Sequence, residues 1–272
     1  MDKLFSSSNR FAEPFPHVRP RFGLLSRIVS RQGTTAAFVC VCTVLGASPV
    51  ESIVGGSESR EPRPVVAVHS PGGPACSAVV LSPDVVLTAG HCITNASDLR
   101  IRSMHTSLHA VDVVVKAPGS DLALVKLHDA LPSDVPMSDL SQEHPAPGSR
   151  ITIAGLGEAL AGANETRGVL REVELRVLAT SSGPSTSQTL LWASGSGAAG
   201  ACHGDSGGNM SRRGATVAVI TVIRSTCGGD TGGVLVGPER AWIDATMVGW
   251  RRSATWVSER APVASTQEPP AR

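Results

Sequence analysis

The chain has 272 residues, and its hydrophobic content of 41% can build the core of one larger domain or two small ones. Its formal net charge of +1 gives no electrostatic reason to expect a nucleic-acid partner. Aromatic residues make up only 3%, so a core must be built from Val, Leu, Ile and Ala.

The first 52 residues differ in kind from the rest, because all five phenylalanines precede Ile53. Arginines lead into an apolar run at residues 36–47 that ends in small residues, which is the pattern of a signal peptide. We therefore expect a signal or targeting segment at residues 1–47, cleaved after Ala47, and a short propeptide at residues 48–52. The run is short for a membrane span of ~20 residues. An uncleaved membrane anchor is the alternative, and a translation start downstream of Met1 stays open.

Short runs rich in Val, Ile and Leu recur between clusters of Gly, Pro, Ser and Asp. The runs are residues 65–68, 77–81, 85–88, 111–116, 122–127, 150–154, 169–177, 189–192 and 216–223. Many short strands at this spacing predict an all-β barrel or sandwich. Pro238 begins a short helical pattern, because proline suits a first helical position. Residues 251–272 are polar and proline-bearing, and they predict a disordered tail.

Three motifs place a base, a carboxylate and a nucleophile along the chain in the order His, Asp, Ser. His91 follows an apolar run in Leu-Thr-Ala-Gly-His-Cys, Asp121 precedes Leu-Ala-Leu-Val, and Ser206 lies in Gly-Asp-Ser-Gly-Gly. A serine hydroxyl needs an imidazole to take its proton, and the imidazole needs a carboxylate to fix its tautomer. Glycines around Ser206 let the N–H groups of Gly204 and Ser206 converge on an oxyanion. The motifs therefore predict nucleophilic acyl transfer.

With these motifs the chain resembles the chymotrypsin/trypsin-like serine peptidases over residues 53–250. The resemblance implies an all-β fold of two packed six-stranded antiparallel β-barrels with a short C-terminal helix. It places His91 and Asp121 on the first barrel and Ser206 on the second, with the site in the cleft between them. It implies a secreted, monomeric serine endopeptidase that hydrolyses polypeptides through an acyl-enzyme. We expect no cofactor and no metal.

The cysteines support an oxidising, extracytoplasmic location. Two of the six cysteines fall in the apolar run, and the other four allow three pairings by count alone. The resemblance selects Cys76–Cys92, which braces the histidine, and Cys202–Cys227, which lies beside the substrate pocket. A metal site is the rival use, but residues 53–272 contain no Cys-x-x-Cys pair.

The resemblance also implies a zymogen. In Ile-Val-Gly-Gly, Ile53 is similar to the N-terminus that these peptidases expose on activation, and Asp205 pairs with the freed α-amino group. A buried carboxylate is costly unless it is paired, so cleavage between Ser52 and Ile53 is expected to order the oxyanion loop. No Lys or Arg precedes the junction, so the expected activator accepts a small residue, and the enzyme itself is one candidate.

The resemblance also implies a substrate pocket. Its floor is Gly200, its wall is formed by Thr221, Val222 and Ile223, and Gly233 lies opposite. A floor without Asp or Glu disfavours specificity for Lys or Arg. Ile223 stands where the family usually has glycine, so we expect small or medium aliphatic residues such as Ala or Val before the scissile bond. Thr221 keeps a hydroxyl expected to reach the catalytic carboxylate. The departures at 221–223 leave a second hypothesis, a non-catalytic binding protein on a peptidase scaffold.

Overall fold

The computed structural model describes residues 53–71, 73–103, 107–183 and 188–258, and the statements below concern these ranges. The expected targeting segment 1–47 and propeptide 48–52 lie outside them. Within the described residues, no helix combines the length and the apolar character needed to cross a membrane.

The first half of the domain closes into a six-stranded antiparallel barrel in the order β2-β3-β4-β7-β6-β5. Its strands are β2 (Val65–Ser70), β3 (Gly73–Ser82), β4 (Val85–Ala89), β5 (Arg100–Arg102), β6 (Leu108–Lys116) and β7 (Leu122–Leu127). Because side chains alternate along a strand, β4 sends Val86 into this barrel's own core and Leu87 outward. Both residues are fully buried, so β4 is apolar on both faces.

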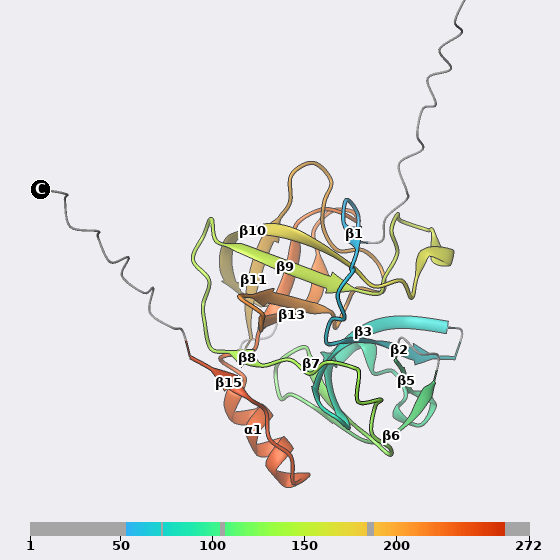
Figure 1. The fold of residues 1–272 in the computed structure, drawn as a ribbon. Helices are drawn as coiled ribbons and strands as arrows, with labels where there is room; N and C mark the ends of the chain where they lie inside the picture. The colour runs from blue at the N-terminus through green and yellow to red at the C-terminus, as the bar shows by residue number, and fades with distance from the viewer. Residues whose placement is uncertain (1–52, 72, 104–106, 184–187, 259–272) are drawn as a thin grey trace, which may run out of the picture. The chain divides into compact units, whose positions relative to one another are not determined.

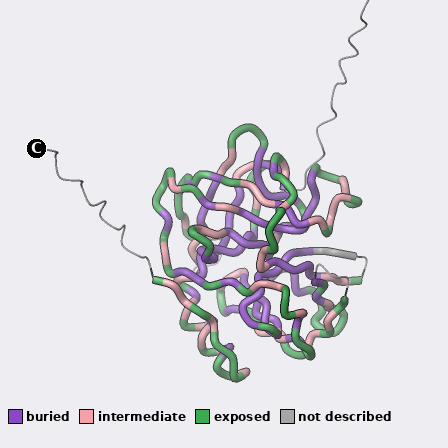
Figure 2. Tube along the Cα trace, in the orientation of Figure 1, coloured by how far each residue is buried: buried purple, intermediate pink, exposed green. Residues whose placement is uncertain are grey.

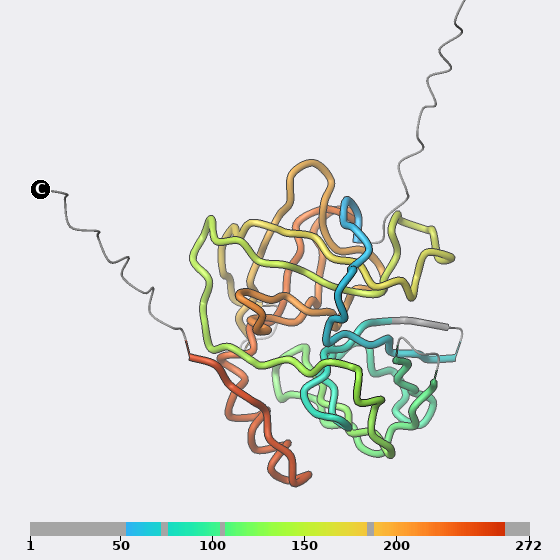
Figure 3. Tube along the Cα trace, viewed as in Figure 1, coloured from blue at the N-terminus to red at the C-terminus, as the bar shows by residue number. Residues whose placement is uncertain are grey.

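The second half forms a second six-stranded barrel, which β12 and β13 close. Its strands are β9 (Arg150–Gly155), β10 (Arg171–Ser182), β11 (Thr189–Ser194), β12 (Asn209–Arg212), β13 (Ala215–Ile223) and β14 (Thr231–Leu235). Three short strands extend this sheet: β1 (Ser57–Glu58) on β10, and β8 (Leu140–Ser141) and β15 (Trp256–Val257) beyond β13. Figures 1 and 3 show the blue N-terminal strand β1 against the yellow strand β10. The expected two-barrel fold is confirmed.

A shared apolar cluster joins the barrels. It contains Leu87 and Leu124 from the first barrel and Trp192 and Val219 from the second. In Figure 2 the longest buried stretches lie on strands such as β4 and β14, whereas β6 is intermediate or exposed along its length. Each fully buried Leu or Val contributes about 1.5–3 kcal/mol relative to an exposed one, so this cluster fixes the cleft between the barrels.

The helix α1 (Arg240–Gly249) packs Ile243 and Met247 into the same cluster. It begins two positions after Pro238, which precedes the helix rather than opening it. Beyond α1, the expected tail at 251–272 is described only to Ser258, and this first part is ordered. Arg252 donates to both carboxylate oxygens of Asp84 at 2.7 Å, and strand β15 pairs with β8.

Both expected disulfides are present. Cys76 is bonded to Cys92 and Cys202 to Cys227. Each bond joins the segment of a candidate catalytic residue, His91 or Ser206, to a neighbouring part of the same barrel.

Candidate active site

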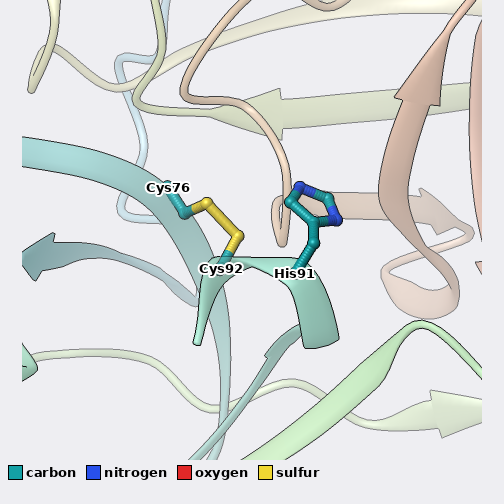
Figure 4. Close-up of side chains that lie close together, drawn as sticks. All are labelled: Cys76, His91 and Cys92. Carbon is teal, nitrogen blue, oxygen red and sulfur yellow. A yellow bond between two sulfur atoms is a disulfide. The ribbon is translucent and has the colours of Figure 1, made fainter. Parts of the chain in front are cut away.

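His91 lies in a short 3-10 turn, η1 (Gly90–Cys92), directly after strand β4. Gly90 donates its N–H to the carbonyl oxygen of Asp121 at 3.0 Å, and a Cβ on Gly90 would lie 3.1 Å from the Asp121 carboxylate. Glycine therefore lets the turn approach the neighbouring strand closely. Figure 4 shows the His91 ring beside the Cys76–Cys92 disulfide, which ties the turn to β3.

These three side chains bring ligand-type atoms within 4.8 Å of one another. Their grouping does not make a metal centre, because metals bind the thiolate and both sulfurs are bonded to each other. The disulfide acts here as a brace for the histidine.

Asp121 holds His91 through both carboxylate oxygens. Oδ1 accepts the main-chain N–H of His91 at 2.8 Å, and Oδ2 lies 2.8 Å from Nδ1. A carboxylate can only accept, so Nδ1 carries the proton and Nε2 has a free lone pair. This tautomer is the one that can take a proton from a serine hydroxyl.

A residue that the sequence analysis did not single out positions Asp121. The main-chain N–H of Asp121 donates to Oε1 of Gln188 at 2.7 Å, and Gln188 is buried. Gln188 immediately precedes β11, so a side chain of the second barrel anchors the carboxylate-bearing segment of the first. Among the described residues no hydrogen bond joins Thr221 to Asp121, so the expected Thr221 contact is not formed. A glutamine in a loop carries no pattern that could have predicted this contact.

The Ser206 turn is bound to the first barrel through β3. Ser77 donates its main-chain N–H to the Ser206 carbonyl at 2.8 Å and its hydroxyl to the Gly204 carbonyl at 2.9 Å. Gly207 has φ +84°, and a Cβ on it would collide with the Ser77 carbonyl and the Thr88 hydroxyl. Only glycine suits both the backbone conformation and this close approach.

His91, Gly204 and Ser206 line one cleft of about 570 Å³. In the described part of the chain, no hydrogen bond connects the Ser206 hydroxyl to His91. Catalytic hydrogen bonds are often long in a free enzyme and tighten when substrate binds. The structure therefore brings the three expected residues to one site, with the His–Asp contact already formed.

The expected substrate-binding residues divide into two groups. Thr221, Val222 and Ile223 line the cleft, whereas Gly200 and Gly233 are not in its lining. The side-chain direction of Gly200 is filled by the carbonyl of Gly229, and that of Gly233 by Met210 and Val219. A side chain therefore does not fit at either glycine, and neither glycine lines the cleft.

A second cavity of about 670 Å³ reaches Asp121 and is lined in part by Gln188, Leu190 and Trp192. It leaves the side chains of His91 and Asp121 47% and 31% exposed. The guanidinium carbon of Arg224 lies 3.7 Å from the centroid of the Trp192 ring and covers it.

Asp205 is fully buried beneath the nucleophile turn. Its carboxylate accepts the N–H groups of Gly157 and Cys202, each at 2.8 Å. Burial raises the pKa of Asp205 to about 7, and nearby Glu158 also raises it, while the two N–H groups lower it.

Ile53 is buried in the core of the second barrel, and Val54 accepts the N–H of Gly200 at 3.0 Å. Ile53 also has φ +47°, a left-handed conformation that β-branched residues rarely adopt. Strain of this kind costs about 1–3 kcal/mol.

Two β-barrels with an aspartate-bound histidine and a serine in one inter-barrel cleft define the architecture of a trypsin-like serine peptidase. The family model for trypsin matches residues 53–243, and the chain belongs to the trypsin family.

Sequence relatives agree with this assignment, and solved structures share the fold. Trypsin alpha of Drosophila erecta is 28% identical over 197 residues, which cover 62% of this chain and 76% of that protein. The alpha- and beta-fibrinogenase OhS1 of Ophiophagus hannah is 25% identical over 188 residues, covering 60% and 72%. Among solved structures, mouse neuropsin has a TM-score of 0.63 at 20% identity, covering 72% of this chain and 100% of that chain. Human heparin binding protein has a TM-score of 0.61 at 20% identity, covering 71% and 96%.

Proposed function

We propose that this protein is a serine endopeptidase that works through an acyl-enzyme. The observation that carries the proposal is the Asp121–His91 pair, held in the tautomer a general base requires, in the cleft that also contains Ser206. Ser206 attacks the scissile carbonyl, and His91 takes its proton and later delivers it to the leaving amine. Asp121 holds the imidazolium that forms.

The main-chain N–H groups of Gly204 and Ser206 are proposed to stabilise the oxyanion. Glu158 donates its N–H to the His203 carbonyl and Gly208 donates its N–H to the Asp205 carbonyl, each at 2.8 Å, and these bonds fix the two peptide planes that carry the Gly204 and Ser206 N–H groups. Loss of one oxyanion donor typically costs ~2.7–4 kcal/mol of barrier.

Cleavage before Ile53 is proposed to activate the enzyme. The buried Asp205 has a raised pKa, so a buried cation would be well placed to pair with it. The φ angle of Ile53 exists only while Ser52 is attached, and cutting that bond releases the left-handed strain. Both effects favour an α-amino group on Ile53 that moves to Asp205.

Secretion into an oxidising compartment is part of the proposal and is supported by the two disulfides. The intact mass of the mature protein measures its N-terminus. We expect a chain that begins at Ile53, and a chain that retains residues 1–47 would instead indicate a membrane anchor.

Labelling with a fluorophosphonate tests the proposed nucleophile. We expect one label per molecule, located on Ser206, and none on the Ser206→Ala variant. A folded wild-type protein that is cut before Ile53 and takes no label would support the non-catalytic binding protein instead.

The cleft wall predicts which residue the enzyme accepts before the scissile bond. Ile223 adds a branched side chain to the wall of the cleft, and Gly200, the expected floor residue, carries no acidic group. In a peptide library we expect cleavage after small or medium aliphatic residues such as Ala and Val. One methylene in such a pocket changes selectivity by about 1–3 kcal/mol. Strong preference for Arg or Phe at this position would refute the assignment of the wall.

A further inference from the structure

The cleft around Ser206 is longer than one substrate residue. Besides the wall at 221–223, it is lined by Ser70 and Thr94 of the first barrel and by Arg167 and His203. If the acyl part of a substrate lies along the 221–223 wall, the residues after the scissile bond must lie against the rest of this lining. Cys76 and Cys92, whose disulfide Figure 4 draws beside His91, also belong to the lining of this cleft.

The charge of this lining has one sign. Arg167 is the one arginine or lysine in the described lining of the cleft, and no Asp or Glu belongs to that lining. A substrate that enters the cleft therefore meets the guanidinium of Arg167, while the carboxylate that pairs with it, that of Glu158, lies behind the lining. Arg167 comes directly after the short 3-10 turn η3 (Asn164–Thr166).

Glu158 holds Arg167 in place from behind. The Nε of Arg167 donates to Oε1 of Glu158 at 3.1 Å, and Gly162 donates its N–H to Oε2 at 2.7 Å. The Glu158 side chain is 3% exposed and that of Arg167 is 24% exposed. The carboxylate thus faces the protein interior, while the guanidinium faces the cleft.

Arg167 is also close to the oxyanion turn. Its Nε lies 3.8 Å from the place a Cβ on Gly204 would occupy. Because Gly204 precedes Ser206 by two residues, a guanidinium at this point lies on the part of the cleft next to the nucleophile turn. A pre-ordered guanidinium loses little side-chain entropy when it binds a carboxylate.

We propose that Arg167 makes the cleft select substrates with Asp or Glu at one of the two positions after the scissile bond. The proposal rests on the peptidase function proposed above and adds the chemical class of the leaving group. Charge-assisted hydrogen bonds to arginine are about twice as strong as neutral ones, and partial exposure weakens them.

The test uses peptides that share one acyl half ending in Ala and carry Asp, Asn or Lys at each of the two following positions. All peptides are amidated, so that a terminal carboxylate does not compete with the side chain. For the wild-type protein we expect kcat/KM to be about tenfold higher for Asp than for Asn and lower still for Lys. Raising the salt concentration is expected to reduce this ratio.

In Arg167→Gln the ratio of kcat/KM for the Asp peptide to kcat/KM for the Asn peptide is expected to fall below about two. Arg167→Glu is expected to cleave the Lys peptide fastest. Arg176→Gln is the matched control, because Arg176 is exposed on β10 and does not line the cleft. It removes the same charge and is expected to keep the wild-type ratio.

Arg167→Gln leaves Glu158 buried without its guanidinium, which can destabilise the fold. The double variant Glu158→Gln/Arg167→Gln removes both charges and gives the same readout. Active molecules are counted by fluorophosphonate labelling. Labelled wild-type protein with an Asp-to-Asn ratio near one, or labelled variants that keep the wild-type ratio, would overturn the proposal. Absence of labelling and of all cleavage would instead overturn the peptidase function itself.

Discussion

Asp121→Asn is expected to lower kcat by about 10⁴ while leaving KM and the fold nearly unchanged. Both carboxylate oxygens of Asp121 accept hydrogen bonds from His91. An asparagine has only one acceptor. If its oxygen keeps the main-chain N–H, its NH₂ group faces Nδ1 and forces the ring proton onto Nε2. In that tautomer His91 cannot take the proton from Ser206.

Kinetics with a peptide substrate measure this loss, and thermal unfolding checks the fold. Asp112→Asn is the matched control, because Asp112 is an exposed carboxylate on β6 that pairs with Lys126 at 2.7 Å. We expect the control to retain its activity. A loss smaller than about tenfold in Asp121→Asn would mean that the carboxylate does not orient the base.

Cleavage before Ile53 is expected to raise both activity and stability, with a defined pH dependence. Burial raises the pKa of Asp205 to about 7 in the uncleaved chain. Below about pH 4 this carboxyl group is protonated in both the folded and the unfolded chain, so it exerts no penalty. As the pH rises towards 7, only the unfolded chain releases the proton. The uncleaved chain should therefore lose up to a few kcal/mol of stability between about pH 4 and 7.

A freed ammonium on Ile53 would reverse this trend, because it favours the ionised carboxylate. The experiment replaces residues 48–52 by the recognition sequence of a specific protease that cuts directly before Ile53. Denaturant unfolding of the cut and uncut forms in a Ser206→Ala background gives the stability from pH 4 to 8. We expect the cut form to be more stable at pH 7 and the difference to disappear near pH 4.

Asp205→Asn is the control for this linkage and should remove the difference at every pH. Activity is compared by fluorophosphonate labelling of chains that retain Ser206, and the uncut chain is expected to react at least about a hundredfold more slowly. Full reactivity of the uncut chain would contradict the activation proposal.

Local sequence patterns were sufficient for most of the framework. Each apolar run expected to form a strand lies wholly or largely in one, since two-sided burial needs continuous Val, Ile and Leu, as in β4 and β7. The apolar runs did not predict the short or atypical strands. Strand β5 has the sequence Arg-Ile-Arg, and β14 contains two adjacent glycines. The glycines of β14 are needed because Trp192 and Met210 fill the space where their side chains would be.

The amino-acid sequence by itself predicted the chemistry of the site, because a histidine, an aspartate and a serine in their motifs carry recognisable local signals. The cysteine count left three pairings open, and the family resemblance selected the pairing that the structure has. Only the tertiary structure decided that Gln188 rather than Thr221 holds the Asp121 segment, and that Gly200 and Gly233 do not line the cleft. It also placed Arg167 beside Gly204. These contacts join residues far apart in the chain, and their side-chain geometry depends on how the two barrels pack, which no local pattern records.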